Sequence, residues 1–156
     1  MSYTRKHVFT LGVVTLFGVS AAFADDEILD IIGEDDVVTL NAALSQLPMD
    51  AVRQYRFGRG YTLVHAAMSY RNSAVAISLI HFHGGDIDAQ DIDGRTPLHH
   101  AIDSDDIFSA RALVNLGART DIPNSANLTA QEFCKGVLEQ TSDHTVCRYL
   151  EEQRTD

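Results

Sequence analysis

The sequence predicts an all-α fold, a solenoid of about four helix pairs stacked in a row with short hairpin-like loops between them. Three observations predict it. Similar segments recur at intervals of about 33 residues, capping and turn residues stand at matching places in each copy, and the apolar residues between them follow helical spacing. Each unit of such a stack buries its apolar side only against its neighbours, so we expect neither a sheet nor a closed cavity.

The repeat appears most clearly at three threonines. Thr62, Thr96 and Thr129 hold the same place in three similar segments, and the interval between them is nearly constant. A second feature keeps the same period, because Gly84 and Gly117 are separated by the same interval as Thr96 and Thr129, and each opens a turn-like stretch. Periods of this length are typical of helical repeat proteins.

The middle copy reads Thr96-Pro97-Leu98-His99-His100-Ala101. With this segment the chain resembles the ankyrin-repeat family, whose signature is T-P-L-H-x-A. The resemblance covers about residues 36–153. The first copy departs from it at Leu63, which replaces the proline, and the third at Ala130 and Glu132, which replace the proline and the histidine. The residues assigned to the structural signature are Thr62, His65, Gly84, Thr96, Pro97, Leu98, His99 and Gly117.

Local chemistry supports the same helices. The hydroxyl of Thr96 is placed to cap the first helix of the middle copy, and Pro97 suits the first helical position because its missing N–H has no partner there. The polar run 103–106 separates this helix from a second one over 107–116, which Gly117 ends. The resemblance implies that the signature histidines tie each helix start to a neighbouring loop.

The chain is expected to divide into a leader, a short lead and a repeat domain. The domain begins with a cap, predicted as a helix pair of residues 36–47 and 49–57, and its last helix is predicted over 145–153. The predicted segments are 1–24 for a signal peptide, 25–35 for a lead or short helix, and 36–156 for the repeat domain, with the cap over 36–56 and the repeats over 57–90, 91–123 and 124–153.

The start of the chain has the features of an export signal. Arg5 and Lys6 precede an uncharged, mostly apolar run over 8–19, and Ala22 and Ala24 put small residues where a signal peptidase reads them. We expect cleavage after Ala24 and a periplasmic location. The alternative is an uncleaved anchor, but this run is short for a helix that must cross about 30 Å of hydrocarbon. After cleavage we expect no membrane insertion.

Two cysteines, Cys134 and Cys147, stand in the last copy. An exported chain permits their oxidation, and the packed helices of one repeat would bring them close enough to bond. A disulfide that clips this end is one interpretation, and two reduced core cysteines are the other. The spacing is not C-x-x-C, so a thioredoxin-type redox site is not indicated.

Catalytic and metal-binding motifs are missing from the sequence. It holds no G-x-S-x-G, no H-E-x-x-H and no phosphate-binding glycine loop, so we expect no catalytic residue, metal or cofactor. His81 and His83 are separated by a single residue and His99 and His100 are adjacent, so on helices their side chains diverge and chelate poorly. The acidic stretch 86–93 lacks the glycine and glutamate positions of a calcium loop and is read as turn chemistry. A metal-binding protein built on histidines and aspartates is kept as the lesser alternative.

The resemblance implies that the chain binds another protein through its hairpin tips and the exposed edge of its first helices. The net charge of −10 repels nucleic acid phosphates and anionic lipids and favours a basic partner protein. Loss of Arg5 and Lys6 with the leader makes the chain still more negative. The predicted partner-binding residues are Arg59, Tyr61, Ser69, Tyr70, Ile92, Asp93, Arg95, Asp103 and Ser104, with Ser125, Ala126 and Leu128 in the third copy.

Together these features predict a non-enzymatic protein–protein interaction module in the bacterial periplasm. The favoured role is an inhibitor or immunity protein that binds a toxin or effector, because a rigid acidic face suits a basic effector. The alternatives are an accessory role in peroxide defence alongside a catalase and a structural adaptor of the cell envelope.

Overall fold

A computed structural model gives the fold, and it describes residues 25–34, 36–69, 72–141 and 143–153. The predicted signal peptide with its cleavage position at Ala24 and the predicted contact residue Tyr70 lie outside the described residues. Within the described ranges, no helix is both long and apolar enough to span a bilayer.

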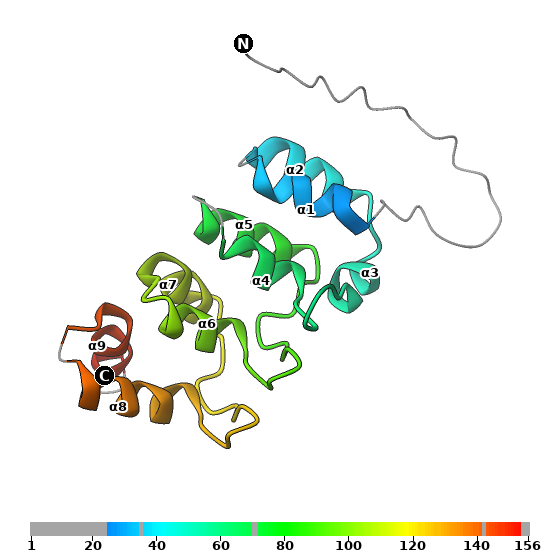
Figure 1. Cartoon of the computed structure of the whole chain (residues 1–156). Coiled ribbons are helices and arrows are strands. Elements are labelled where there is room, and N and C mark those ends of the chain that lie inside the picture. The colour runs from blue at the N-terminus through cyan, green and yellow to red at the C-terminus, as the bar shows by residue number, and fades with distance from the viewer. Residues whose placement is uncertain (1–24, 35, 70–71, 142, 154–156) are drawn as a thin grey trace, which may run out of the picture.

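The described residues form helices joined by turns (Figure 1). Their only bridge between extended residues joins Phe57 to Tyr61. The helices are α1 (Asp25–Gly33), α2 (Val37–Ser45), α3 (Met49–Gln54), α4 (Leu63–Ala67), α5 (Ser73–Phe82), α6 (Pro97–Asp103), α7 (Ile107–Asn115), α8 (Ala130–Gln140) and α9 (Thr145–Glu152).

Eight of these helices form four pairs, which stack one after another from α1 to α9 (Figure 1). The pairs are α1 with α2, α4 with α5, α6 with α7, and α8 with α9. Helices α1, α4, α6 and α8 pack in this order along one side, which we name the inner row, and α2, α5, α7 and α9 form the outer row. The predicted all-α repeat fold of four helix pairs is confirmed.

The N-terminal pair differs from the prediction. We expected residues 36–47 to pair with 49–57, but α2 packs against α1 and α5, while α3 lies in the connection that follows α2. Helix α1 takes the inner position because Ile28, Ile31 and Ile32 are buried in the common core. The predicted pairing was therefore wrong, and the lead segment supplies the inner helix of the first pair.

Three inner helices begin with the same reciprocal cap. The N–H of Thr96 donates to Nδ1 of His99 at 3.3 Å, and the N–H of Thr62 donates to Nδ1 of His65 at 3.2 Å. Glu132, which replaces the histidine in the third copy, accepts from the N–H of Thr129 at 2.9 Å. Capping satisfies donors that the first turn of a helix leaves without a partner. The predicted cap role of Thr96 is confirmed, and the third copy keeps the cap despite its altered sequence.

The hairpin-like loops repeat as closely as the helices do. Each is closed by an equivalent backbone hydrogen bond, from Phe57 to Tyr61, Asp91 to Arg95 and Asn124 to Leu128, at 2.9 to 3.0 Å. Their tips also bond to one another across units.

The two tip bonds between units are equivalent. The N–H of Ile92 donates to the carbonyl of Arg59, and the N–H of Ser125 donates to that of Asp93, both at 2.9 Å. Gly94 has a φ of +70°, and a Cβ there would lie 2.8 Å from the backbone nitrogen of Ser125. The close approach of neighbouring tips therefore requires glycine at this position.

A disulfide joins Cys134 in α8 to Cys147 in α9, with their Cα atoms 5.2 Å apart. This bridge decides between the two interpretations left open by the sequence. It ties together the two helices of the terminal pair, which has a neighbour on one side within the described stack. A cross-link restricts the unfolded chain and so stabilises the folded end of the stack.

Candidate protein-binding groove

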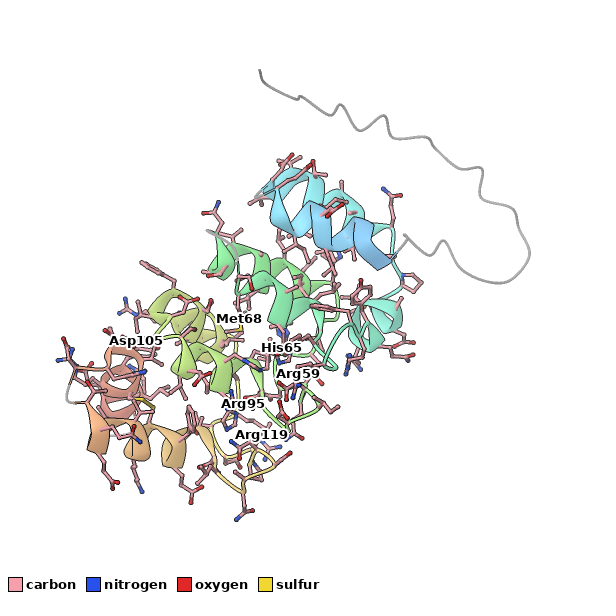
Figure 2. The ribbon with its side chains drawn as sticks, viewed as in Figure 1. Arg59, His65, Met68, Arg95, Asp105 and Arg119 are labelled. Atoms are coloured by element: carbon pink, nitrogen blue, oxygen red, sulfur yellow. A yellow bond between two sulfur atoms is a disulfide. The ribbon has the colours of Figure 1, made fainter. Side chains whose placement is uncertain are left out.

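A groove of about 580 Å³ opens on the inner row, where α4 packs between α1 and α6. Figure 2 places Met68 and His65 in this region, between α4 and α6. One wall comes from α4 and the loop before it, and the other from α6. The lining residues are Leu29, Phe57, Tyr61, His65, Ala66, Met68, Ser69, His100, Asp103 and Ser104.

The groove exists because neighbouring units differ at equivalent positions. Ala66 and Ser69 precede His100 and Asp103 by one full repeat. The α4 side therefore carries short side chains where the α6 side carries longer ones. In the next unit, Phe133 stands at the position of Ala66 and packs against His99, with ring centroids 6.2 Å apart. His100 holds the corresponding place at the first junction, where its ring packs against His65, so the groove results from the short side chains of Ala66 and Ser69.

Aromatic and imidazole rings form one continuous wall of the groove. The centroid of Tyr61 lies 5.8 Å from Phe57, 5.5 Å from His65 and 5.6 Å from His100. The two histidine rings meet edge to face at 5.2 Å. Ring pairs at such distances are mutually stabilising and rigid, so they hold a preformed surface.

His65 is uncharged in this wall at neutral pH. Burial, together with the nearby His100, lowers the pKa of His65 to about 4, although the Arg95 backbone acts in the opposite direction. Because Nδ1 accepts the cap bond from Thr62, the proton of the neutral ring belongs on Nε2. This Nε2 is buried without a hydrogen-bond partner among the described residues.

The equivalent nitrogen of His99 is satisfied. Its Nε2 lies 3.1 Å from the carbonyl of Leu128 in the next unit, to which it donates. Burial lowers the pKa of His99 as well. The resemblance implied that the signature histidines bind a neighbouring loop, and His99 does so; His65 interacts with the equivalent backbone of Arg95, but its Nε2 does not reach hydrogen-bond geometry.

Behind the groove, a buried aspartate orients His100. The carboxyl of Asp91 accepts from the N–H of Asp93 at 2.8 Å and of Arg95 at 2.9 Å, and Nε2 of His100 lies 2.8 Å from its other oxygen. Burial alone would raise the pKa of Asp91, but these hydrogen bonds outweigh it and the pKa is lowered. Asp91 is therefore a carboxylate whose bonds fix the His100 ring against Tyr61.

The rim of the groove carries exposed ion pairs. Asp103 pairs with Arg95 at 3.3 Å, and their side chains are 55% and 33% exposed. Farther along, Arg59 and Asp93 pair at 2.8 Å between neighbouring hairpin tips. Exposed pairs of this kind contribute at most about 1 kcal/mol to stability, so their charges can exchange partners at little cost.

Similarity to known proteins supports this arrangement. A family model described as ankyrin repeats, in three copies, matches residues 33–124, more than half of the chain. This chain belongs to the ankyrin-repeat family. Ankyrin repeats indicate a protein–protein interaction module, and such domains are generally non-catalytic. The match ends before α8, yet the pair α8–α9 continues the ankyrin stack with the same helix cap.

Curated relatives share the ankyrin repeats over part of this chain. The ADP-ribosylation factor GTPase-activating proteins AGD4 and AGD2 of Arabidopsis thaliana are each 36% identical to it over 74 residues. The putative ankyrin repeat protein FPV219 of fowlpox virus (strain NVSL) is 32% identical over 73 residues. Each match covers 47% of this chain, but only 9% of either plant protein and 17% of the viral protein.

The structure brings together part of the predicted ankyrin contact set. Tyr61, Ser69, Asp103 and Ser104 line the groove, and Arg95 pairs with Asp103 beside it. The remaining residues predicted in the first two copies that can be described, Arg59, Ile92 and Asp93, lie at the hairpin tips, where Ile92 is 69% exposed.

Sequence reasoning missed several residues that line the groove. Leu29 was missed because α1 was not recognised as an inner helix, and Phe57 because it was placed at the end of the cap. Ala66, Met68 and His100 stand close to signature residues, and the offset of one repeat from Ala66 to His100 was the signal that could have found the groove.

Among the described residues of this ankyrin domain, no three histidine, cysteine, aspartate or glutamate side chains converge to hold a metal ion. His81 and His83 have separate partners, since Nδ1 of His81 lies 3.1 Å from the carbonyl of Gly85 and Nε2 of His83 lies 2.9 Å from Asn41.

Proposed function

We propose that this ankyrin-repeat protein is an exported, non-enzymatic inhibitor or immunity protein that holds a basic toxin or effector in the groove of its inner row. The observation that carries the proposal is the preformed groove itself. Tyr61, His100 and Asp91 fix one another in place, so a partner meets a surface that need not be reordered on binding.

The charge of the chain supports a basic partner. Acidic residues outnumber basic ones, 22 to 12, and Asp103 places a half-exposed carboxylate at the mouth of the groove. Opposite charge speeds the encounter of two proteins and excludes partners of the same sign. A basic effector fits this surface, whereas an acidic one is repelled.

The proposal of export rests on two further observations. Residues 1–24 have the basic start, apolar run and small residues of a signal peptide. Cys134 and Cys147 form a disulfide, which is typical of compartments outside the reducing cytoplasm. N-terminal sequencing of protein recovered from the periplasm should give a mature start directly after Ala24. A mature start at Met1 would contradict export by cleavage.

Affinity capture from periplasmic extract tests the binding role. The wild-type protein should retain a basic protein at low salt and release it as salt is raised, because screening weakens attraction between opposite charges. Asp103→Lys should lose this capture. Glu151→Lys is the matched control, because it makes the same charge reversal at the exposed end of α9 and should bind as wild type does. Equal retention by both variants would move the binding site away from the groove.

A further inference from the structure

The groove has a size and a lining that distinguish it from the rest of the inner row. Its α4 side is made shallow by Ala66 and Ser69, and its opposite side is formed by the fixed ring of His100. Leu29 adds a side chain from α1 to the lining.

We propose that the groove takes one large apolar side chain of the partner against the rings of Tyr61 and His100, and that a lysine or arginine next to it pairs with Asp103. This inference rests on the proposed binding function and names the chemistry of the segment that is bound.

The apolar half of the proposal follows from the state of the surrounding rings. Tyr61 and Phe57 offer aromatic surface, and His65 is neutral because its pKa lies far below neutral pH. A neutral, ring-lined recess binds an apolar side chain by removing both surfaces from water. Aromatic and aliphatic anchors that fill such recesses dominate the binding energy of protein interfaces.

The expected lysine or arginine in the partner follows from which of two nearby carboxylates is available to it. Asp91 already accepts three hydrogen bonds and is buried. Asp103 is half-exposed, and its ion pair with Arg95 is exposed too, so a cation from a partner can join or replace Arg95. An acidic residue next to the anchor would instead face Asp103 and the negative charge of the whole chain.

Four short peptides test both halves on the purified protein. They are capped tetrapeptides with the central pairs Phe-Lys, Phe-Glu, Ala-Lys and Ala-Glu between glycines, titrated into isotope-labelled protein by NMR. The Phe-Lys peptide should shift the amide signals of Ala66, Met68, Ser69 and Asp103 and half-saturate at a concentration roughly tenfold or more below that of Ala-Lys, since a missing side chain in an apolar recess changes affinity by about this factor or more. Phe-Glu should also bind more weakly than Phe-Lys.

Equal responses to all four peptides, or the strongest shifts around Phe108 in the outer-row recess between α5 and α7, would overturn the proposal. The variant Ser69→Trp fills the groove with a ring of its own and should abolish the shifts at Ala66 and Met68. Ser78→Trp adds the same ring to the exposed surface of α5 in the outer row and should leave the titration unchanged.

Failure of this inference and failure of the proposed function can be told apart by the captured protein partner. If Asp103→Lys loses the partner but Ser69→Trp keeps it, the groove rim binds the partner and the apolar anchor is wrong. If neither variant changes capture, the binding function of this groove is wrong as well. The peptide titration on wild-type protein decides the anchor even where Ser69→Trp is poorly folded.

Discussion

Two of the three junctions of the inner row, α4 with α6 and α6 with α8, are built from equivalent residues but differ in their contacts. At the second junction, Nε2 of His99 reaches the carbonyl of Leu128 and Phe133 packs on the imidazole ring. At the first, Nε2 of His65 has no partner within the described residues, and Ala66 leaves the ring-lined groove open. Both junctions have a ring contact, since His100 packs on His65 as Phe133 packs on His99, but the first lacks a hydrogen bond from Nε2 to the next loop. The difference favours a binding surface at the junction whose own contacts are incomplete.

The largest expected effect concerns the disulfide. Its removal tests whether the α6–α8 junction depends on the covalent link between α8 and α9. Replacing Cys134 and Cys147 together by alanine should destabilise the protein by about 3 kcal/mol, since the bridge closes a loop of similar length to those for which this cost is known. Urea denaturation of oxidised protein measures the change. Reduced wild-type protein should behave like the double variant, and an unchanged midpoint in both would mean that α8 and α9 hold together without the bridge.

Removing the signature histidines one at a time compares the junctions directly. His99→Ala deletes a cap and a bond to the next unit, so we expect a loss of about 2–3 kcal/mol of unfolding free energy. His65→Ala deletes a cap and the ring contacts with Tyr61 and His100 but no hydrogen bond to the next unit, and it should cost about 1–2 kcal/mol. Denaturation curves under identical conditions give the difference. Equal losses would show that the bond to Leu128 contributes nothing.

Acid should lower the stability of the fold through the protonation of His65 at the α4–α6 junction. The pKa of His65 falls from 6.5 to about 4 on folding, so between these pH values the unfolded chain binds more protons than the folded one. Stability therefore falls as the pH drops from 7, by about 2 kcal/mol at pH 5 from this group. His65→Gln keeps a group that can accept the cap bond and should flatten this part of the pH profile. A variant with the wild-type slope would assign the acid sensitivity to other groups, His99 first among them.

The smallest expected effect on stability belongs to the rim. Asp103→Lys breaks only an exposed pair with Arg95, so the free energy of unfolding should change by less than about 1 kcal/mol. Thermal unfolding followed by circular dichroism measures this change. A larger loss would mean that Asp103 is part of the framework, and any loss of partner binding by this variant would then have to be read as a loss of fold.

Much of the fold could be predicted because the repeat fixes it locally. Thr96 and Pro97 mark a helix start, Gly117 marks a helix end, and the period carries both to the neighbouring copies. The first pair was predicted wrongly because α1 has no cap signature, although counting one period back from Leu63 leads to Leu29 in α1. The first inner helix could therefore be inferred from the spacing even where the signature is missing.

The groove was harder to predict because it depends on side chains from different units. Ala66 and Ser69 are ordinary in sequence, and they matter only because His100 and Asp103 stand opposite them. The orientation of His100 likewise depends on Asp91, whose carboxyl was read as turn chemistry and bonds both its own loop and the histidine. Pairings of this kind become visible only once the stacking order is known.

The backbone bonds between hairpin tips carry a consequence for how this molecule can change. Because Ile92 and Ser125 bond to the preceding tip through main-chain atoms, this link between units does not depend on which side chains face the inner row. Exposed residues such as Ser69 and Asp103 can then be exchanged for others while the bonds between the tips are kept. Point substitutions in the groove can thus change which ligand is bound while the backbone bonds between the units stay the same.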